Sequence, residues 1–257
     1  SIFGLITLFV VYYLQDGIIG FVRNALNLKP AAQSLDSIKL APVRGDAIAN
    51  AAQSGTAQAS DELITARNVL MQFGGLKALN DVELRVKRGT VHGLIGPNGS
   101  GKSTMMNVLT GIYVPTAGEI SFSGRSVVGR TSSDIALSGI ARTFQNVQLF
   151  GEMTALQNVM VGLHHSFASN LLDVALHSPR YSREDTANTA RALGLLQFVG
   201  LADLAHEEAR NLPYGKQRLL EIARALALDP QLLLLDEPAA GLTAPDIKEL
   251  VAIIGKI

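Results

Sequence analysis

The sequence contains no cysteine, so it can form neither a disulfide framework nor a metal site with thiolate ligands, which fits a reducing compartment. It also lacks an excess of either charge, because 22 lysine and arginine residues balance 22 aspartate and glutamate residues. A broad nucleic-acid-binding surface needs surplus basic side chains to replace the counterions of the phosphates. The composition therefore disfavours nucleic acid as a partner.

Charge is also missing from residues 1–14, SIFGLITLFVVYYL, which are almost entirely apolar. As a helix this run would be about 21 Å long, which is shorter than a full membrane crossing. A secretory signal peptide would carry a positive segment ahead of the run, and a buried amphipathic helix would show a polar face; neither feature is present. We therefore expect residues 1–29 to be the truncated end of a membrane helix, with Arg23 and Lys29 in its cytoplasmic tail.

The rest of the chain divides into two regions of different composition. Residues 30–61 are rich in Ala, Gln and Ser without a sustained apolar period, which predicts a flexible linker. From residue 62 to 257, apolar runs alternate with Gly-rich turns and helical stretches, and no internal repeat is evident. This alternation predicts an α/β fold with a largely buried sheet. Strands are expected at residues 63–73, 82–86 and 90–96, and a helix at 101–112.

The segment GPNGSGKST matches the phosphate-loop pattern G-x-x-x-x-G-K-[ST], and it lies between the third predicted strand and the predicted helix, where the motif requires it. Its glycines let backbone N–H groups turn inward around phosphate oxygens, and the following helix adds its positive N-terminal dipole. Lys102 can reach the β- and γ-phosphates, and Ser103 can offer its hydroxyl to Mg²⁺. A chance Gly-rich turn is the alternative. The candidate nucleotide-binding residues are Gly96, Pro97, Asn98, Gly99, Ser100, Gly101, Lys102, Ser103 and Thr104.

A second motif, LLLLDEP, occupies residues 232–238. Four consecutive leucines are typical of a strand buried on both faces, and carboxylates at the end of such a strand lie where open α/β sheets bind ligands. Asp236 is expected to hold Mg²⁺ through water, and Glu237 to polarise the attacking water as the catalytic base. The alternative is a solvated turn after an ordinary strand.

The segments GPNGSGKST, ARTFQNVQLF, LPYGKQRLLEIARALALDP and LLLLDEPAAGL, in this order, resemble the ATPase subunits of ABC transporters. The resemblance covers residues 62–257 and implies a P-loop NTPase fold of the ABC ATPase type with a helical subdomain, binding ATP and Mg²⁺. Three further features, FGGLKALNDV, LFGEMTALQNVMVGLHH and a Pro-Tyr pair within LPYGK, resemble the ATPases of branched-chain amino-acid importers in particular.

The resemblance assigns a further role to LPYGK, which aligns with a signature that caps a helix facing the γ-phosphate bound by a second ATPase domain. A helix from about Lys216 to Leu228 would supply the dipole, and the small Gly215 would permit close approach. Pro213 and Tyr214 stand where Ser and Gly are usual, as in the branched-chain importer group, and Lys216 replaces a Gln. The implied signature residues are Leu212, Pro213, Tyr214, Gly215 and Lys216.

Weaker assignments follow from the same resemblance. Gln145 matches a glutamine that touches Mg²⁺ and the attacking water, and the stretch from Gln145 to Met153 matches the region that meets the membrane subunit. Phe73 matches the aromatic that stacks on adenine, although a Phe at the end of an apolar strand is as often a core residue. Thr243 stands in the loop that crosses the dimer interface, where Asp or Asn is commoner.

One expected element is missing from the sequence. ABC ATPases carry a histidine that contacts the γ-phosphate, on a strand about thirty residues beyond the Asp-Glu pair. All five histidines, His92, His164, His165, His177 and His206, precede Glu237. The domain is therefore expected to be truncated before this histidine and to hydrolyse ATP poorly by itself. At the other end, LFVVYYLQDGIIGFVRN resembles the last helix of a branched-chain amino-acid permease, which suggests a permease fused to its ATPase.

Three functions remain open at this point. The first is a transport ATPase at the cytoplasmic face of the inner membrane, partnered by a second ATPase domain and a permease, and indirectly by a solute-binding protein, with no nucleic acid involved. The second is an ABC ATPase that acts on nucleic acid or the ribosome, which the neutral charge disfavours. The third is a nucleotide-binding module without hydrolysis, suggested by the missing histidine and the unusual signature.

Overall fold

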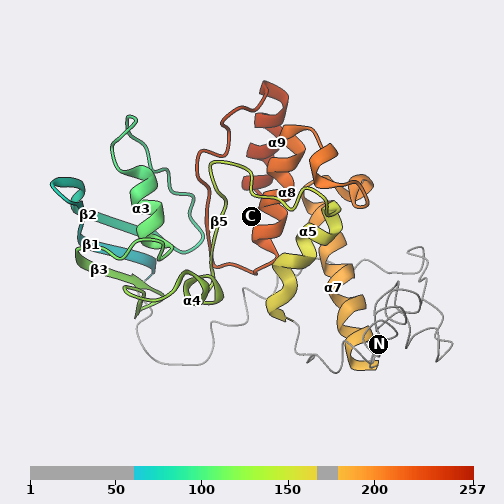
Figure 1. The fold of residues 1–257 in the computed structure, drawn as a ribbon, viewed down its shortest axis with the longest axis horizontal. Coiled ribbons are helices and arrows are strands. Elements are labelled where there is room, and N and C mark those ends of the chain that lie inside the picture. Colours follow the sequence, from blue (N-terminus) through green and yellow to red (C-terminus); the bar gives the residue numbers. More distant parts are fainter. Residues whose placement is uncertain (1–60, 167–178) are drawn as a thin grey trace, which may run out of the picture. The chain divides into compact units, whose positions relative to one another are not determined.

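The computed structural model of the chain describes residues 61–166 and 179–257, in which strands and helices alternate (Figure 1). The predicted membrane helix, and all but the last residue of the predicted linker, lie outside the described residues. Within the described part, no helix is long and apolar enough to cross a membrane. The chain divides into two compact units, and the boundary falls within helix α7 (Pro179–Phe198), between Ala187 and Asn188.

Four antiparallel strands form the larger sheet, in the order β2-β1-β3-β4. The long strands β1 and β2 join through a two-residue turn. In this turn Gly74 has a φ of 56°, a backbone angle that residues other than glycine rarely adopt. The strands predicted at residues 63–73 and 82–86 are confirmed. The strand bounds are β1 Glu62–Phe73, β2 Leu76–Lys87, β3 Ala117–Phe122 and β4 Arg125–Ser126.

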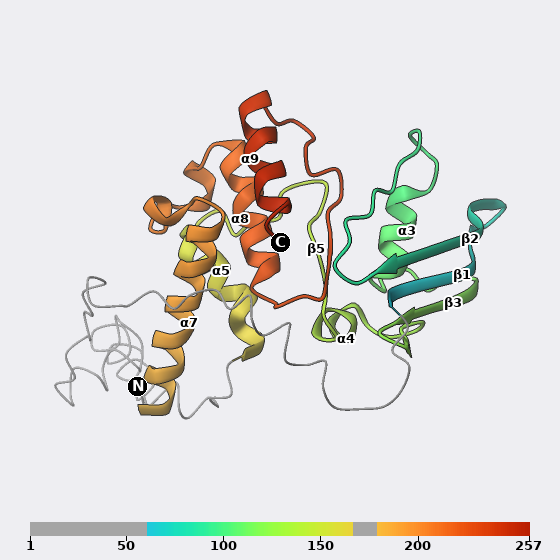
Figure 2. The same cartoon turned by 180° about the vertical axis from the view of Figure 1, so that it is seen from behind.

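Helix α3 (Lys102–Leu109) lies beside this sheet in both views (Figures 1 and 2). Its buried residues Met105, Val108 and Leu109 share a hydrophobic cluster with apolar side chains of the sheet. Burying a side chain of this size stabilises the fold by about 1.5–3 kcal/mol. The predicted helix at residues 101–112 is confirmed in type, although it ends three residues sooner because Gly111 adopts a left-handed φ of 70° just after the C-cap Thr110.

A second, parallel sheet contains only β5 (Ile140–Arg142) and β6 (Leu232–Leu234) within the described residues. The strand predicted at residues 90–96 is wrong, because this segment has no regular secondary structure, and Val91 and Ile95 are 84% and 91% exposed. An apolar strand needs hydrogen-bonded neighbours, and no pairing is found for this segment among the described strands. Strand β6 is confirmed but only half-buried; of its leucines, only Leu234 is buried.

A second hydrophobic cluster lies among α5, α8, α9 and the last part of α7. Helices α5 and α8 contact each other, and Val159 and Leu220 are fully buried there. Thr154 begins α5 with a capping box, in which its hydroxyl accepts from Gln157 N and its N–H donates to Gln157 Oε1. The remaining helices are α4 Ser132–Leu137, α5 Ala155–Gly162, α8 Tyr214–Leu226 and α9 Ala244–Ile254, with 3₁₀ turns at Leu163–Ser166, Ala202–Leu204 and Ala209–Asn211.

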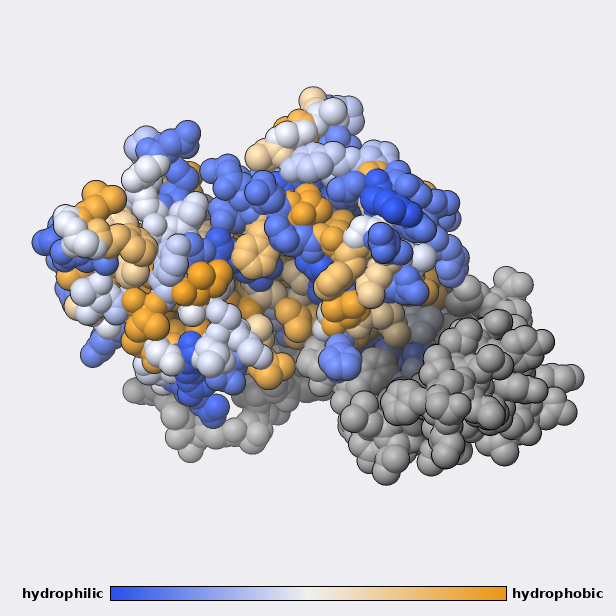
Figure 3. All heavy atoms as spheres, viewed as in Figure 1, coloured by the Kyte–Doolittle hydropathy of each residue, from blue (hydrophilic) through white to orange (hydrophobic). Residues whose placement is uncertain are grey.

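Apolar side chains also reach the surface, where Figure 3 shows them interspersed with hydrophilic ones over the face in view. Phe150 and Met153, which precede α5, are 49% and 39% exposed. Both belong to the stretch that the family resemblance places against a membrane subunit.

Candidate nucleotide-binding site

The segment Gly96–Gly101 forms a turn that leads directly into α3. Gly99 and Gly101 have φ values of 82° and 93°, in the region that favours glycine. A Cβ atom on Gly101 would lie 2.6 Å from the carbonyl oxygen of Ala78 in β2, so only glycine fits there. No side chain caps α3, and its first turn has no acidic residue. The N-terminal dipole of α3 is thus left without a carboxylate against it, as an anion site requires.

The ammonium group of Lys102 lies across this turn. Its Nζ donates to the carbonyl oxygens of Gly96 and Pro97, at 2.8 and 2.9 Å. The cation is therefore held over the loop rather than extended into solvent. The hydroxyl-bearing Ser103 is exposed at the start of α3. Both side chains are thus placed at the loop that the sequence motif assigned to phosphate.

Phe73 ends β1 and is 42% exposed. The ring of Phe73 meets the ring of Tyr113 nearly perpendicularly, with centroids 5.3 Å apart. An edge contact of this kind fixes the ring while leaving surface for another partner. Phe73 is therefore a supported surface aromatic rather than a core residue.

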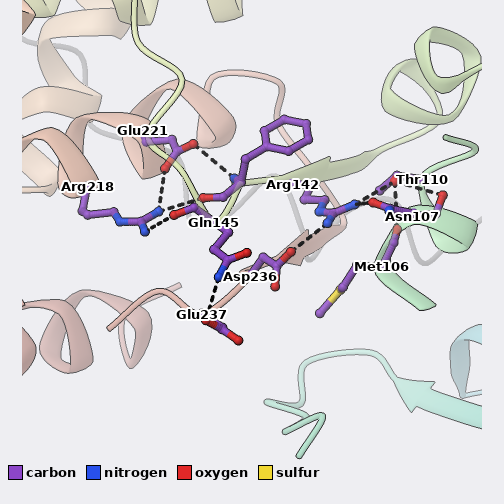
Figure 4. A network of polar contacts seen from close by, with 10 residues as sticks. Met106, Asn107, Thr110, Arg142, Gln145, Arg218, Glu221, Asp236 and Glu237 are labelled. Atoms are coloured by element: carbon purple, nitrogen blue, oxygen red, sulfur yellow. Dashed lines mark hydrogen bonds and ion pairs between the residues drawn. The ribbon is translucent and has the colours of Figure 1, made fainter. Parts of the chain in front are cut away.

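Asp236 follows β6 and is 7% exposed. Its Oδ2 accepts from Arg142 Nη2 at 2.7 Å, and Arg142 Nη1 donates to Asn107 Oδ1 at 2.7 Å (Figure 4). Arg142 also donates to the hydroxyl of Thr110 at 3.3 Å. The buried guanidinium therefore connects Asp236 to α3, the helix that begins at the phosphate loop.

Glu237 is exposed beside Asp236 and faces Gln145. The amide Nε2 of Gln145 donates to Glu237 Oε2 at 3.2 Å, across 92 positions of sequence (Figure 4). Glu237 has a φ of 45°, which costs a non-glycine residue about 1 kcal/mol or more. Strain of this kind is retained where the surrounding structure demands a particular direction of the side chain.

The predicted signature begins α8, which starts at Tyr214, two residues before the position expected from the sequence. Pro213 and Tyr214 are exposed, whereas Leu212 and Gly215 are buried. A Cβ atom on Gly215 would lie 2.6 Å from Asp246 Cγ, so the glycine admits a carboxylate of α9. Lys216 pairs with Glu249 of α9, at 2.8 and 2.9 Å from its two carboxylate oxygens.

The structure brings some of the predicted residues together and leaves others apart. Asp236, Glu237 and Gln145 form one group that Arg142 links to α3. Among the described residues, no hydrogen bond or ion pair joins the side chains of residues 96–104 to this group or to the signature. Thr243 caps α9 instead, donating its N–H and hydroxyl to Asp246 Oδ2 at 3.3 and 2.6 Å.

Four charged residues of this region were missed in the sequence: Arg142, Arg218, Glu221 and Asp246. The first three are buried or nearly so, although Arg142 and Glu221 each stand in an otherwise apolar run. A charge at a buried position requires a partner, and this was the signal available. One turn after Glu221, burial lowers the pKa of Arg224, and the charge of Glu221 partly offsets that effect.

The donor set fits a nucleotide with a divalent cation. The loop offers backbone N–H groups and one ammonium to phosphates, while Ser103 and Asp236 offer the oxygen atoms that Mg²⁺ prefers. Arg142 occupies Oδ2 of Asp236, which leaves Oδ1 for a second partner.

The chain is similar in sequence to several known proteins. The sequence profile of the ABC transporter family matches residues 79–240. The chain is 42% identical over 198 residues to the high-affinity branched-chain amino acid transport ATP-binding protein LivG of Salmonella typhimurium, covering 77% of this chain and 78% of LivG. LivG of Escherichia coli is 41% identical, and BraF of Pseudomonas aeruginosa, which carries the same functional name, is 42% identical, both with the same coverage.

Solved structures of ATP-binding cassettes have the same fold. The ADP conformation of MJ1267, an ATP-binding cassette of an ABC transporter, superposes with a TM-score of 0.66 at 31% identity, covering 77% of each chain. The dimeric structure of MJ0796, a bacterial ABC transporter cassette, gives a TM-score of 0.63 at 28% identity, covering 75% of this chain and 82% of that one. The predicted α/β fold of the ABC ATPase type is confirmed.

Proposed function

This chain belongs to the ABC transporter family, and we propose that it is the ATP-binding and ATP-hydrolysing subunit of an importer for branched-chain amino acids. The family follows from the profile match and from relatives that are 41–42% identical to this chain over 198 residues. The solute class rests on the names of those relatives, because a permease and a solute-binding protein select the solute. The subunit would act at the cytoplasmic face of the inner membrane.

Binding of ATP begins at the phosphate loop. Backbone N–H groups of the loop and of the first turn of α3 would donate to the phosphates, and Lys102 would exchange the carbonyls of Gly96 and Pro97 for phosphate oxygens. This exchange replaces two neutral acceptors with charged ones, which form stronger hydrogen bonds with an ammonium. The partly exposed ring of Phe73 would stack on the adenine.

Mg²⁺, when bound, neutralises charge that develops on the phosphates during transfer. Ser103 would hold it through the hydroxyl, Asp236 through Oδ1 or an intervening water, and Gln145 through its amide oxygen. Arg142 keeps Asp236 in one orientation, because it binds Oδ2 at 2.7 Å.

The observation that carries the hydrolytic function is the contact between Gln145 and Glu237. Glu237 acts as the base that takes a proton from the attacking water. The amide of Gln145 donates to Oε2 at 3.2 Å and so orients the carboxylate, leaving Oε1 for the water. Without this orientation, the base would sample directions from which no proton transfer is possible.

A second ATPase domain completes the site in this proposal. The first turn of α8, which no side-chain hydrogen bond caps although the Asp246 carboxylate lies against Gly215, carries the signature residues Leu212–Lys216 and would face the γ-phosphate bound by that domain. Two sites would then form between two domains, and closing them would drive the permease. The chain has a neutral composition and is not proposed to bind nucleic acid.

Uptake measurements in proteoliposomes test this function. Proteoliposomes that contain the full-length protein and its permease are supplied with a solute-binding protein. They should accumulate radiolabelled leucine only when Mg-ATP is present on the side of the membrane that holds the ATPase. Leucine uptake should be competed by isoleucine and valine but not by an acidic amino acid. Hydrolysis of ATP without any uptake of these solutes would support the proposed ATPase activity but reject the proposed import of branched-chain amino acids. Absence of hydrolysis in the full-length protein would favour a nucleotide-binding module.

A further inference from the structure

We propose that Arg218 and Glu221, a buried ion pair on α8, are positioning residues that hold Gln145 in register with Glu237. This inference rests on the hydrolytic function proposed above. It adds a role for two side chains that touch neither Glu237 nor the phosphate loop through any hydrogen bond or ion pair among the described residues.

Both side chains reach from α8 to one short stretch of backbone at Gln145 (Figure 4). Arg218 Nη1 donates to the carbonyl oxygen of Phe144 at 2.7 Å, and Nη2 donates to that of Gln145. Glu221 Oε1 accepts from the N–H of Phe144 at 3.1 Å. The two side chains also pair with each other at 3.4 Å and are only 3% and 2% exposed. Three backbone groups are therefore bound by two charged side chains that are closed off from water.

The pairing of β5 with β6 stops at Thr143, and the contacts with Arg218 and Glu221 begin at the next residue, Phe144. Thr143 N donates to Leu234 O at 3.0 Å, one residue beyond the last paired position of β5 and β6. Gln145 is itself exposed, and its side-chain bond to Glu237 is exposed as well. A surface hydrogen bond of this kind contributes about 1 kcal/mol and does not immobilise a loop by itself. The direction of the Gln145 side chain is therefore set by its backbone, and that backbone is held by α8.

The attraction between the two charges does not by itself account for the pair. An apolar pair of similar volume is often as stable as a buried ion pair, since both charges must be desolvated. Arginine also presents a planar fork that binds two acceptors at a fixed separation, which lysine cannot do. The fork is used here on two successive carbonyls. We therefore assign the pair to the placement of Gln145.

The test replaces both charges together, because removing one would leave the other buried and unpaired. In the full-length protein, Arg218→Met with Glu221→Leu should bind ATP unchanged at temperatures where it is folded, although its unfolding temperature should fall because three backbone groups of Phe144 and Gln145 lose their partners. Its kcat for hydrolysis should fall between about tenfold and a hundredfold, as a misplaced group does. Adding Gln145→Ala should cause no further fall, since the pair acts through Gln145. The control is Arg210→Gln with Glu208→Gln, an exposed pair, which should leave kcat unchanged.

Two results would overturn the positioning role: an unchanged kcat, or a loss that adds fully to that of Gln145→Ala. A second readout needs no hydrolysis and so separates this inference from the proposed function. In ¹⁵N-labelled protein, the side-chain amide signal of Gln145 is identified by its loss in Gln145→Ala. It should shift in the Arg218/Glu221 variant and stay in place in the Arg210/Glu208 control. An unmoved signal in both variants would reject the inference even if the wild type hydrolyses ATP.

Discussion

Arg142 and Asp236 form a buried ion pair, with 2.7 Å between Nη2 and Oδ2 and with side chains only 6% and 9% exposed. The pair joins the end of β5 to Asp236, two residues beyond the end of β6, and Asn107 extends it to α3. A carboxylate proposed to serve Mg²⁺ is therefore a structural element of the domain as well.

Arg142→Gln should destabilise the protein by about 3–5 kcal/mol, because it leaves Asp236 buried without its cation. Urea unfolding of both proteins measures the difference in the free energy of unfolding. Arg85→Gln is the matched control, since Arg85 is 55% exposed and its nearest carboxylates lie 3.7 and 3.9 Å away. A small loss in the Arg142 variant, equal to that in the control, would mean that water reaches the pair in solution.

Gly215→Ala should destabilise α8 by about 1–3 kcal/mol, because the added methyl group would overlap the carboxylate of Asp246. The cost should shrink when Asp246→Ala is present, and a double-mutant cycle on the free energy of unfolding measures this coupling. Gly75→Ala is the control, because a methyl group there would point into open space, with no atom beyond its chain neighbours within 4 Å. If the losses in the free energy of unfolding of the two single variants simply add in the double variant, the cost of Gly215→Ala does not come from Asp246.

Lys102→Ala should abolish tight binding of Mg-ATP, because it removes the one cation placed over a loop otherwise built from backbone dipoles. Titration with a fluorescent ATP analogue gives the dissociation constant. Lys256→Ala removes an equal charge from an exposed position and should bind as the wild type does. Undiminished affinity in the Lys102 variant would move the nucleotide site away from this loop.

Glu237→Gln should bind ATP but hydrolyse it about a hundredfold more slowly, because the amide keeps the shape of the base but takes no proton. The trapped protein should also accumulate as an ATP-bound dimer. Phosphate release and size-exclusion chromatography on the full-length protein give both quantities. Glu207→Gln, at an exposed position, is the control for charge. If Glu237→Gln hydrolyses ATP as fast as the wild type, Glu237 is not the catalytic base. If the variant stays monomeric in the presence of ATP, the result counts against a nucleotide site formed between two ATPase domains.

The stretch from Gln145 to Met153 should contact a cytoplasmic loop of the permease. The chain has no cysteine, so single cysteines can be placed at the exposed Gln148 and Glu152 without background reaction. Paired with cysteines in permease loops, they should form cross-links whose yield depends on nucleotide. A cysteine at Asp203, exposed in a 3₁₀ turn, is the control. No cross-link under any nucleotide condition would leave the transport proposal without a mechanical connection.

Local sequence patterns were sufficient wherever a feature depends on neighbouring residues alone. The glycine spacing from Gly96 to Gly101 indicated the phosphate loop, and the alternation in residues 62–87 indicated two strands. Both depend on backbone preferences and on apolar periods within a dozen residues. The order of four motifs was also enough to indicate the family, which the comparisons bear out.

Tertiary structure decided which of these parts meet. Residues 90–96 have the composition of a strand, but a strand forms only with partners, and composition does not supply them. The contacts of Arg142 with Asp236, and of Gln145 with Glu237, join residues 94 and 92 positions apart. The hydrogen bonds of Arg218 and Glu221 with the backbone of Phe144 likewise join residues more than 70 positions apart. Such pairings depend on how the elements pack and on the cost of burying an unpaired charge, so they became visible only in the folded chain.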